Sequence, residues 1–371
     1  MSLFQRLAVR RELIKVFKYG ALHVGSEERP IYPHISRLVI KDSVIEIVFR
    51  LPFGMDPKEI EKKLYVFEQI FGENIELDVD SLYIKLLVYK NASLSNVYDY
   101  EMIKKELKGR RLGVVGGIDK HGKTYSYDMT KQPHLLIAGE TGSGKSTQLR
   151  QILTSFIITY PPSKLKLYLG DCKRSEFHIF RKVEHVQCVH ATPRDIKHML
   201  REVQTEMHRR SELTEEYEVA NIEDLPKGFK VPYIVVAIDE FVMLRNESDI
   251  MESLIEIVSI GRSLGVFAIL SLQRPNAKIL DTTVRAMLTV AMGFQLRDLV
   301  EERICNTPGA SKLKEPGQLI LNSDDNYSLQ APYLELEKAK ELLQPYIVDK
   351  PKTVVKKEPI EELTEEDIFN D

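Results

Sequence analysis

The stretch from residue 135 to residue 160 constrains the fold more than any other part of the chain. Four apolar residues at 135–138 precede a segment that fits the P-loop pattern at every fixed position, Gly139-Glu140-Thr141-Gly142-Ser143-Gly144-Lys145-Ser146. The residues after it place an apolar stripe on one face of a helix expected to end near 160, namely Leu149, Ile152, Leu153, Phe156 and Ile157. A strand, a glycine-rich loop and a helix in this order predict a phosphate-binding site in an α/β fold. The glycines let backbone N–H groups turn toward the phosphates, and the helix N-terminus adds a favourable dipole.

The chemistry of such loops assigns roles to individual residues. We expect Lys145 to reach the β- and γ-phosphates of ATP, and Ser146 to supply a hydroxyl to Mg²⁺. The expected nucleotide-binding residues are Gly139, Glu140, Thr141, Gly142, Ser143, Gly144, Lys145, Ser146 and Thr147. A chance P-loop string is the alternative, but the strand before it and the helix after it argue against chance.

A second apolar run, residues 233–238, ends in the acid pair Asp239-Glu240. An uninterrupted apolar run is typical of a strand that is buried on both faces. We expect Asp239 to hold the Mg²⁺ shell and Glu240 to orient and polarise the attacking water. A kinase needs no glutamate directed at water, so the pair favours an ATPase. The alternative is an acid pair with a structural role.

A third run, residues 266–272, is followed by Gln273-Arg274-Pro275. If this strand lies beside the P-loop strand, the Gln273 side chain can sense the γ-phosphate and pass its presence to the loop that follows. The alternative is an ordinary polar residue at the end of a strand.

The 371 residues are enough for two or three domains. Residues 1–30 are expected to form a basic amphipathic helix at 2–18 whose apolar stripe is Leu3, Leu7, Ile14 and Phe17. Either this helix rests on an anionic membrane surface or a partner, or it packs on its own domain. Residues 31–108 are expected to form a small ββαββ domain with strands at 38–40, 44–49, 75–79 and 82–89.

The helix of that small domain is expected at 55–71, with Asp56 as N-cap, Pro57 at the first position, and a buried stripe of Ile60, Leu64, Phe67 and Phe71. Residues 109–345 alternate apolar strand runs with amphipathic helices, which predicts a mostly parallel sheet flanked by helices. Its first part, 109–133, is interpreted as a junction with a hairpin at 119–122. The acidic tail, 346–371, is expected to be disordered or to bind a partner.

Composition limits the location and the partners. Apolar runs long enough to span a membrane are absent from the sequence, and the basic first twenty residues do not resemble a signal peptide. The three cysteines, Cys172, Cys188 and Cys305, are far apart and fit neither a disulfide framework nor a zinc site, so we expect a cytoplasmic protein. The formal net charge is −3, so any DNA contact must be a local patch.

Over residues 112–345 the sequence resembles the FtsK/SpoIIIE family of hexameric DNA translocases, within the HerA–FtsK superfamily. The resemblance depends on segments that occur in the same order as in the family. They are 117–122, 133–139, Asp171-Cys172-Lys173, 206–210, 232–240 and 261–275. The small domain at 31–90 resembles, more loosely, the domain that precedes the motor in that family. The resemblance implies a RecA-like motor, ATP at subunit interfaces, a ring of subunits, and double-stranded DNA in its channel.

The resemblance also implies further roles. Arg262 matches the arginine that related conjugation motors supply in trans to a neighbour's nucleotide; a surface ion pair is the alternative. Lys278 and Arg285, after Pro275, are candidates for contacts with DNA phosphates, or belong to an ordinary solvated loop. On the strand after Gln273-Arg274-Pro275 the family usually carries an arginine; this chain has Gln295 at that position, with Arg297 two residues on.

The single motor resembles the transfer or coupling proteins of mobile elements. We therefore expect a translocase for conjugative, plasmid or phage DNA transfer or segregation, with a relaxase or other transfer protein as partner and with peripheral membrane contact through residues 1–20. The first alternative is an FtsK-like ATPase for protein secretion, and the second is an ATP-binding adaptor that is not a motor.

Overall fold

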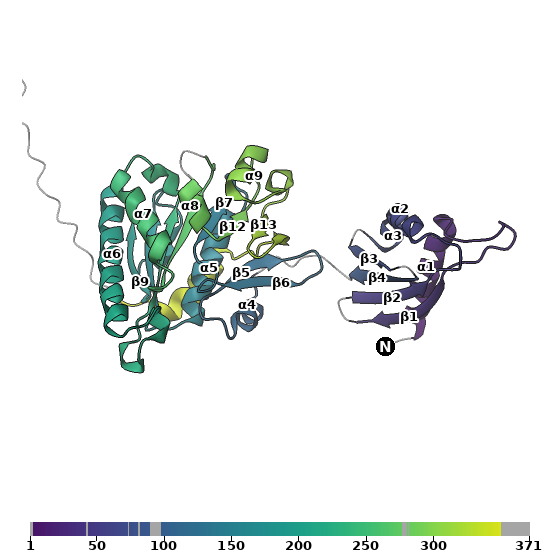
Figure 1. Ribbon diagram of the computed structural model, residues 1–371, viewed down its shortest axis with the longest axis horizontal. Coiled ribbons are helices and arrows are strands. Elements are labelled where there is room, and N and C mark those ends of the chain that lie inside the picture. The colour runs from purple at the N-terminus through teal and green to yellow at the C-terminus, as the bar shows by residue number, and fades with distance from the viewer. Residues whose placement is uncertain are drawn as a thin grey trace, which may run out of the picture.

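The structure, a computed structural model, describes residues 3–41, 44–72, 74–80, 82–89, 98–276, 280 and 282–349. These residues build two separate sheets (Figure 1). One is a four-stranded antiparallel sheet in the order β1-β2-β4-β3, and the other has ten strands in the order β6-β5-β14-β13-β12-β7-β11-β10-β8-β9. None of the helices in the described ranges is long and apolar enough to cross a membrane.

Six neighbouring strands of the large sheet are parallel, and four strands at the other side are antiparallel. The parallel strands are β7 (Leu135–Ala138), β8 (Leu165–Asp171), β9 (Val186–His190), β10 (Tyr233–Asp239), β11 (Val266–Leu272) and β12 (Val290–Gly293). The antiparallel strands are β5 (Gly113–Ile118), β6 (Thr124–Asp128), β13 (Gln318–Asn322) and β14 (Asn326–Gln330). The prediction of an α/β fold with a mostly parallel sheet is confirmed.

Helices cover both faces of the large sheet (Figure 1). One face carries α6 (Pro193–Glu216), α7 (Ser248–Ile260) and α8 (Thr282–Met287), and the other carries α5 (Lys145–Thr159) with α4 (Tyr100–Leu107) and α10 (Leu336–Leu343) packed on it. In β10, Val236 and Ile238 join the first hydrophobic core, whereas Val235 and Ala237 join the second. Both faces of β10 are therefore buried, which explains its uninterrupted apolar run.

Short helical segments connect these elements. They are α9 (Leu299–Cys305) and the 3₁₀ turns η1 (Phe177–Phe180), η2 (Ile222–Asp224), η3 (Lys227–Phe229), η4 (Phe241–Leu244), η5 (Ala310–Lys312) and η6 (Gln344–Tyr346). The turn η4 directly follows Glu240, and η2 and η3 lie between α6 and β10.

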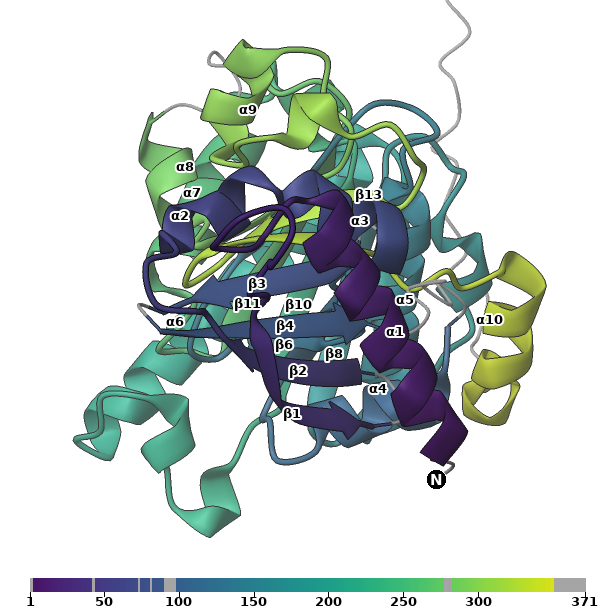
Figure 2. The same cartoon turned by 90° about the vertical axis from the view of Figure 1, so that its right-hand side faces the viewer.

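The small sheet has its own hydrophobic core. Its strands are β1 (His34–Ile40), β2 (Val44–Arg50), β3 (Ile75–Val79) and β4 (Tyr83–Tyr89), and its helices are α1 (Leu3–Tyr19), α2 (Pro57–Lys62) and α3 (Leu64–Phe71). Figure 2 shows α1 beside α3 on one face of this sheet. Phe17, Phe49 and Phe67 meet in the middle of the core, with ring centroids 5.1 and 6.3 Å apart.

The apolar stripe predicted for the first helix is wrong at two positions. Leu7 and Ile14 are 47% and 37% exposed, whereas Leu13, Val16 and Phe17 are buried. Residues 13, 16 and 17 also fall on one helix face by the i, i+3, i+4 rule, and the position of the sheet decides which face is covered. The alternative that this helix packs on its own domain is the one observed.

Three further expectations for the N-terminal half are corrected. The helix expected at 55–71 divides at Lys63, whose N–H bonds Ile60 O at 3.1 Å in a tighter turn, and Leu64 is 37% exposed. The segment 109–133, interpreted as a junction, forms strands β5 and β6 of the large sheet, with a tight turn at Asp119 and Gly122. Helix α4 packs on α5 and β5, although we expected the small domain to extend to residue 108.

Candidate nucleotide-binding site

The candidate site lies at the carboxyl edge of the parallel strands. The P-loop follows β7, Asp239 ends β10, and Gln273 follows β11. β11 pairs with both β7 and β10, with Leu272 opposite Ala138. Parallel pairing brings the carboxyl ends of these strands to one edge of the sheet, which is where ligands of open α/β sheets bind.

Backbone contacts with three other segments of the chain hold the P-loop in place. Its Gly139 N–H donates to Leu272 O at 3.3 Å and its Glu140 N–H to Gln295 O at 2.8 Å, while Ser143 O accepts the Gly317 N–H at 2.8 Å. Gly144 has φ +115 and caps the N-terminus of α5, and a Cβ there would come within 3.0–3.1 Å of the Gly317 backbone. Because of this φ and this close approach, position 144 requires glycine.

Lys145 begins α5 and lies across the loop, where its Nζ donates to the carbonyls of Gly139 and Glu140. The residue is only 7% exposed. Burial lowers the pKa of Lys145 to about 8, although the nearby carboxylates of Glu240 and Asp239 act in the opposite direction. A buried ammonium with so little hydration is well placed to bind a polyphosphate, because it loses little solvation on contact.

Asp239 and Glu240 are the acidic part of the site, and they are 6% and 5% exposed. Burial raises the pKa of Asp239 above its usual range, and the neighbouring Ser271 hydroxyl opposes that shift. Glu240 has a left-handed backbone, with φ 53, directly after the strand. Its Oε1 accepts the Gln273 N–H at 3.3 Å, so the end of β11 helps to orient the carboxylate.

Lys173 is a contact of the site that we did not assign from the sequence. Its Nζ lies 3.0 Å from Oε2 of Glu240. The loop that carries it wraps around the carboxylate of Asp171, which accepts the N–H groups of Ser175, Glu176 and Phe177 at 3.0–3.1 Å. The signal was present in the sequence, because Asp171-Cys172-Lys173 directly follows a strand parallel to the P-loop strand and must therefore end at the same edge.

The donors present fit a magnesium ion held together with phosphates. Among the described residues no group of three or more His, Cys, Asp and Glu side chains is placed to hold a metal. Mg²⁺ usually takes one or two protein ligands, substrate phosphates and water. The buried carboxylate of Asp239 and the hydroxyl of Ser146, in the first turn of α5, are ligands of that kind.

The structure does not bring all the predicted site residues together. Gln273, Glu240 and Lys145 share the carboxyl edge, whereas exposed Arg262 lies in the loop before β11, at the amino edge. Seven strand residues, about 20 Å, separate Arg262 from the carboxyl edge of its own chain. Arg285 is exposed in the last turn of α8. Lys278, and the tail from residue 350, lie outside the described residues.

Comparisons with known proteins agree with this geometry. Residues 102–230 match the model of the FtsK/SpoIIIE family. The chain is 28% identical over 281 residues to the DNA translocase FtsK of Oceanobacillus iheyensis, which covers 69% of this chain and 36% of that protein. The chain thus spans little more than a third of the length of this curated relative.

Two solved structures share the fold. The pCW3 conjugation coupling protein TcpA, in its monomer form with ATPγS, aligns with a TM-score of 0.62 at 20% identity, covering 90% of this chain and 98% of that one. The cytoplasmic domain of the Thermomonospora curvata type VII secretion ATPase EccC aligns with a TM-score of 0.60 at 24% identity, covering 69% of this chain and 33% of that one.

The family match includes the P-loop, and the alignment with the relative is longer than the family match. The P-loop and Lys173 therefore lie within the matched residues, whereas Asp239, Glu240 and Gln273 follow them in the chain. This chain is therefore a homologue of the FtsK/SpoIIIE family, whose model matches its residues 102–230.

Proposed function

We propose that this protein hydrolyses ATP in order to translocate double-stranded DNA, as a subunit of a ring. The observation that carries the proposal is the separation of the two halves of the site. Lys145, Asp239 and Glu240 lie at the carboxyl edge of the sheet, while Arg262 is exposed at the amino edge. A second copy that docks its amino edge against this carboxyl edge would complete the site, as the interfaces of a closed ring do.

In this proposal each residue has one task. Lys145 binds the β- and γ-phosphates, and Ser146 and Asp239 hold Mg²⁺, which offsets phosphate charge. Glu240 orients the attacking water and accepts its proton. Gln273, bonded to Glu240 through its backbone, reports the occupancy of the site to the loop that follows β11. Arg262 of a neighbouring subunit stabilises the charge that develops on the transferred phosphoryl group.

DNA would be held through phosphates and without reading sequence. Of the two candidates for such a contact, Arg285 lies within the described residues, and it is exposed. Each phosphate neutralised contributes about −0.9 to the slope of log affinity against log salt. The homology to DNA translocases supports DNA as the substrate, and the fold shared with a conjugation coupling protein supports DNA transfer, with a relaxase or other transfer protein as partner.

The deciding measurement is the ATPase rate of the purified protein with and without duplex DNA of unrelated sequences. We expect stimulation by every duplex, weakening as salt rises. A rate that DNA leaves unchanged would refute a DNA motor. The second candidate, a protein-secretion ATPase, is favoured by the fold shared with EccC. Stimulation by a secreted substrate protein rather than by duplex DNA would support it.

For location we propose a cytoplasmic protein with peripheral membrane contact through the exposed side of α1, whose other side packs on the small sheet. The basic residues Arg6, Arg10 and Lys15 are exposed on this helix, beside exposed Leu7 and Ile14. Such a face suits an anionic lipid surface. Co-sedimentation of the full chain with anionic and neutral vesicles tests this idea. Equal recovery with both kinds of vesicle would contradict it.

A further inference from the structure

The loop at residues 261–265, between α7 and β11, is fixed through its backbone. Four consecutive carbonyls of the loop, those of residues 261 to 264, accept hydrogen bonds. The donors are the N–H groups of Val266 (2.8 Å), Gly265 (3.2 Å) and Ile222 (3.0 Å), and the guanidinium of Arg210 (2.8 Å). Loops that connect elements at a surface usually keep some carbonyls for water, so such complete pairing points to a loop that must hold one shape.

The glycines at both ends of the loop are required by its packing. A Cβ on Gly261 would collide with the carbonyl oxygens of Ile257 and Val266. Gly265 has φ +65, and a Cβ there would collide with the side chain of Ile222. The loop therefore has a rigid base, and Arg262 is exposed on it. Among the described residues, no hydrogen-bond or ion-pair partner is found for its guanidinium.

Arg210, near the end of α6, is the side chain that ties this loop to the rest of the fold. It is completely buried, and it donates to Leu264 O, Pro232 O and Oε1 of Glu206, each at 2.8 Å. Pro232 precedes β10 and Leu264 lies just before β11. One guanidinium thus joins α6 to the amino ends of two neighbouring strands.

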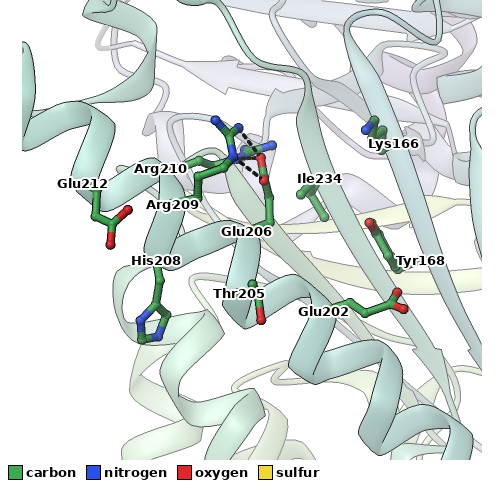
Figure 3. A pocket seen from close by; sticks show the side chains of 10 residues that line it. All are labelled: Lys166, Tyr168, Glu202, Thr205, Glu206, His208, Arg209, Arg210, Glu212 and Ile234. Atoms are coloured by element: carbon green, nitrogen blue, oxygen red, sulfur yellow. Dashed lines mark hydrogen bonds and ion pairs between the residues drawn. The ribbon is translucent and has the colours of Figure 1, made fainter.

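The neighbouring Arg209 provides a contrast within the same cluster (Figure 3). Its side chain is half exposed and binds both oxygens of Glu206, at 2.7 and 2.8 Å. Burial alone would raise the pKa of Glu206, but the bonds from Arg209 and Arg210 outweigh it and lower that pKa to about 2. Glu206 therefore stays ionised and compensates the buried charge of Arg210, whereas Arg209 has no bond to the loop.

We infer that Arg210 is a positioning residue for Arg262: it holds the 261–265 loop so that the Arg262 guanidinium is presented to the nucleotide of a neighbouring subunit. This inference rests on the proposed trans role of Arg262. A guanidinium suits the task because its fork of donors reaches two carbonyls and a carboxylate at once, while a lysine ammonium at the same place keeps the charge but lacks that fork.

The test uses mixed assemblies of full-length chains. Arg210→Lys should keep the ATP affinity of the isolated chain and lose roughly 10²-fold in DNA-stimulated hydrolysis, the size of effect that a misplacement of about 1 Å can have. Mixing it with Glu240→Gln subunits should restore activity, because one chain then supplies Glu240 and the other a well-placed Arg262. Mixing it with Arg262→Ala should restore nothing. The matched control, Arg209→Ala, should behave as wild type.

The outcomes separate the inference from the function on which it rests. If Arg262→Ala and Glu240→Gln do not complement each other, the trans role fails and the inference fails with it. If those two complement but Arg210→Lys complements Arg262→Ala, or fails with Glu240→Gln, Arg210 does not act through Arg262. Should Arg210→Lys not fold, as judged by thermal unfolding, Glu206→Gln replaces it. We expect this variant to fall in the same complementation class with a smaller loss, and wild-type hydrolysis by it would contradict the inference.

Discussion

The charged groups at the two edges of the parallel strands differ in burial and in their partners. At the carboxyl edge, Lys145, Asp239 and Glu240 are all less than a tenth exposed and lie close enough to influence one another's charge. At the amino edge, Arg262 is exposed on a rigid loop and has no partner among the described residues. In our proposal the first edge binds a nucleotide within one chain, whereas the second acts only when another subunit docks against it.

The same contrast holds for how each edge is kept rigid. The P-loop is braced by backbone bonds with residue 272 at the end of β11, residue 295 after β12 and residue 317 just before β13. The 261–265 loop is braced by a buried side chain, Arg210, from a helix. Mutations at the carboxyl edge should therefore change properties of the single chain, such as ATP binding. Mutations at the amino edge should change only properties of the assembly, such as the rate of hydrolysis.

The largest expected effect is at Arg262. Arg262→Ala should lower DNA-stimulated hydrolysis about 10³-fold, since an arginine supplied in trans stabilises transition-state charge by this order. ATP affinity of the isolated chain should not change, because Arg262 lies at the edge away from its own P-loop. The measurements are the hydrolysis rate in the assembly and the Kd for ATP at a dilution where the chain is monomeric. Weaker ATP binding by monomeric Arg262→Ala would show that the amino edge also affects nucleotide binding within one chain.

Glu240→Gln should have the next largest effect, a loss of about 10²-fold in hydrolysis, because a positioned general base is removed. Binding of ATP should persist, since Lys145 and the P-loop remain. Single-turnover hydrolysis and equilibrium ATP binding measure the two properties separately. Glu252→Gln, an exposed glutamate on α7, is the matched control. Hydrolysis at the wild-type rate in Glu240→Gln would show that Glu240 is not the general base.

The pH dependence of ATP binding should reflect Lys145. Its pKa of about 8 is lowered by burial, and bound phosphates should raise it again. Protonated Lys145 is the form that binds, so affinity is flat below pH 8 and falls by up to about tenfold per pH unit above it. Calorimetry between about pH 7.5 and 9.5 measures this. Lys145→Arg stays charged throughout and should flatten the curve; an equally steep curve in that variant would assign the titration to another group.

The smallest expected effect is at Lys173. Lys173→Met removes a partly exposed ion pair to Glu240, worth about 1 kcal/mol, so kcat should fall about fivefold with KM unchanged. The matched control is Lys164→Met, an exposed lysine before the amino end of the same strand, β8, which should have no effect. A higher rate in Lys173→Met would mean that Lys173 restrains Glu240 instead of orienting it.

Much of the carboxyl edge could be predicted from the sequence. β7 matches the expected strand, α5 ends one residue before the expected limit, and all five residues of its predicted stripe are buried. These predictions succeeded because the P-loop, the apolar run of β10 and the acid pair are local patterns whose physical requirement is local. The bond between Glu240 and Lys173 joins residues 67 positions apart, and no local pattern requires it.

The sequence by itself determined the α/β class, the P-loop, and the acid pair at the end of β10. Each of these depends on residues that are adjacent in the chain: the glycines of the loop, the apolar run of the strand and the phosphate-binding side chains. Only the tertiary structure decided which face of α1 is covered, that residues 109–133 add two strands to the main sheet, and that Arg210 grips the loop of Arg262. The reason is that each of these depends on which distant backbone carbonyl or apolar surface comes within contact distance, and that follows from the order of strands in the sheet.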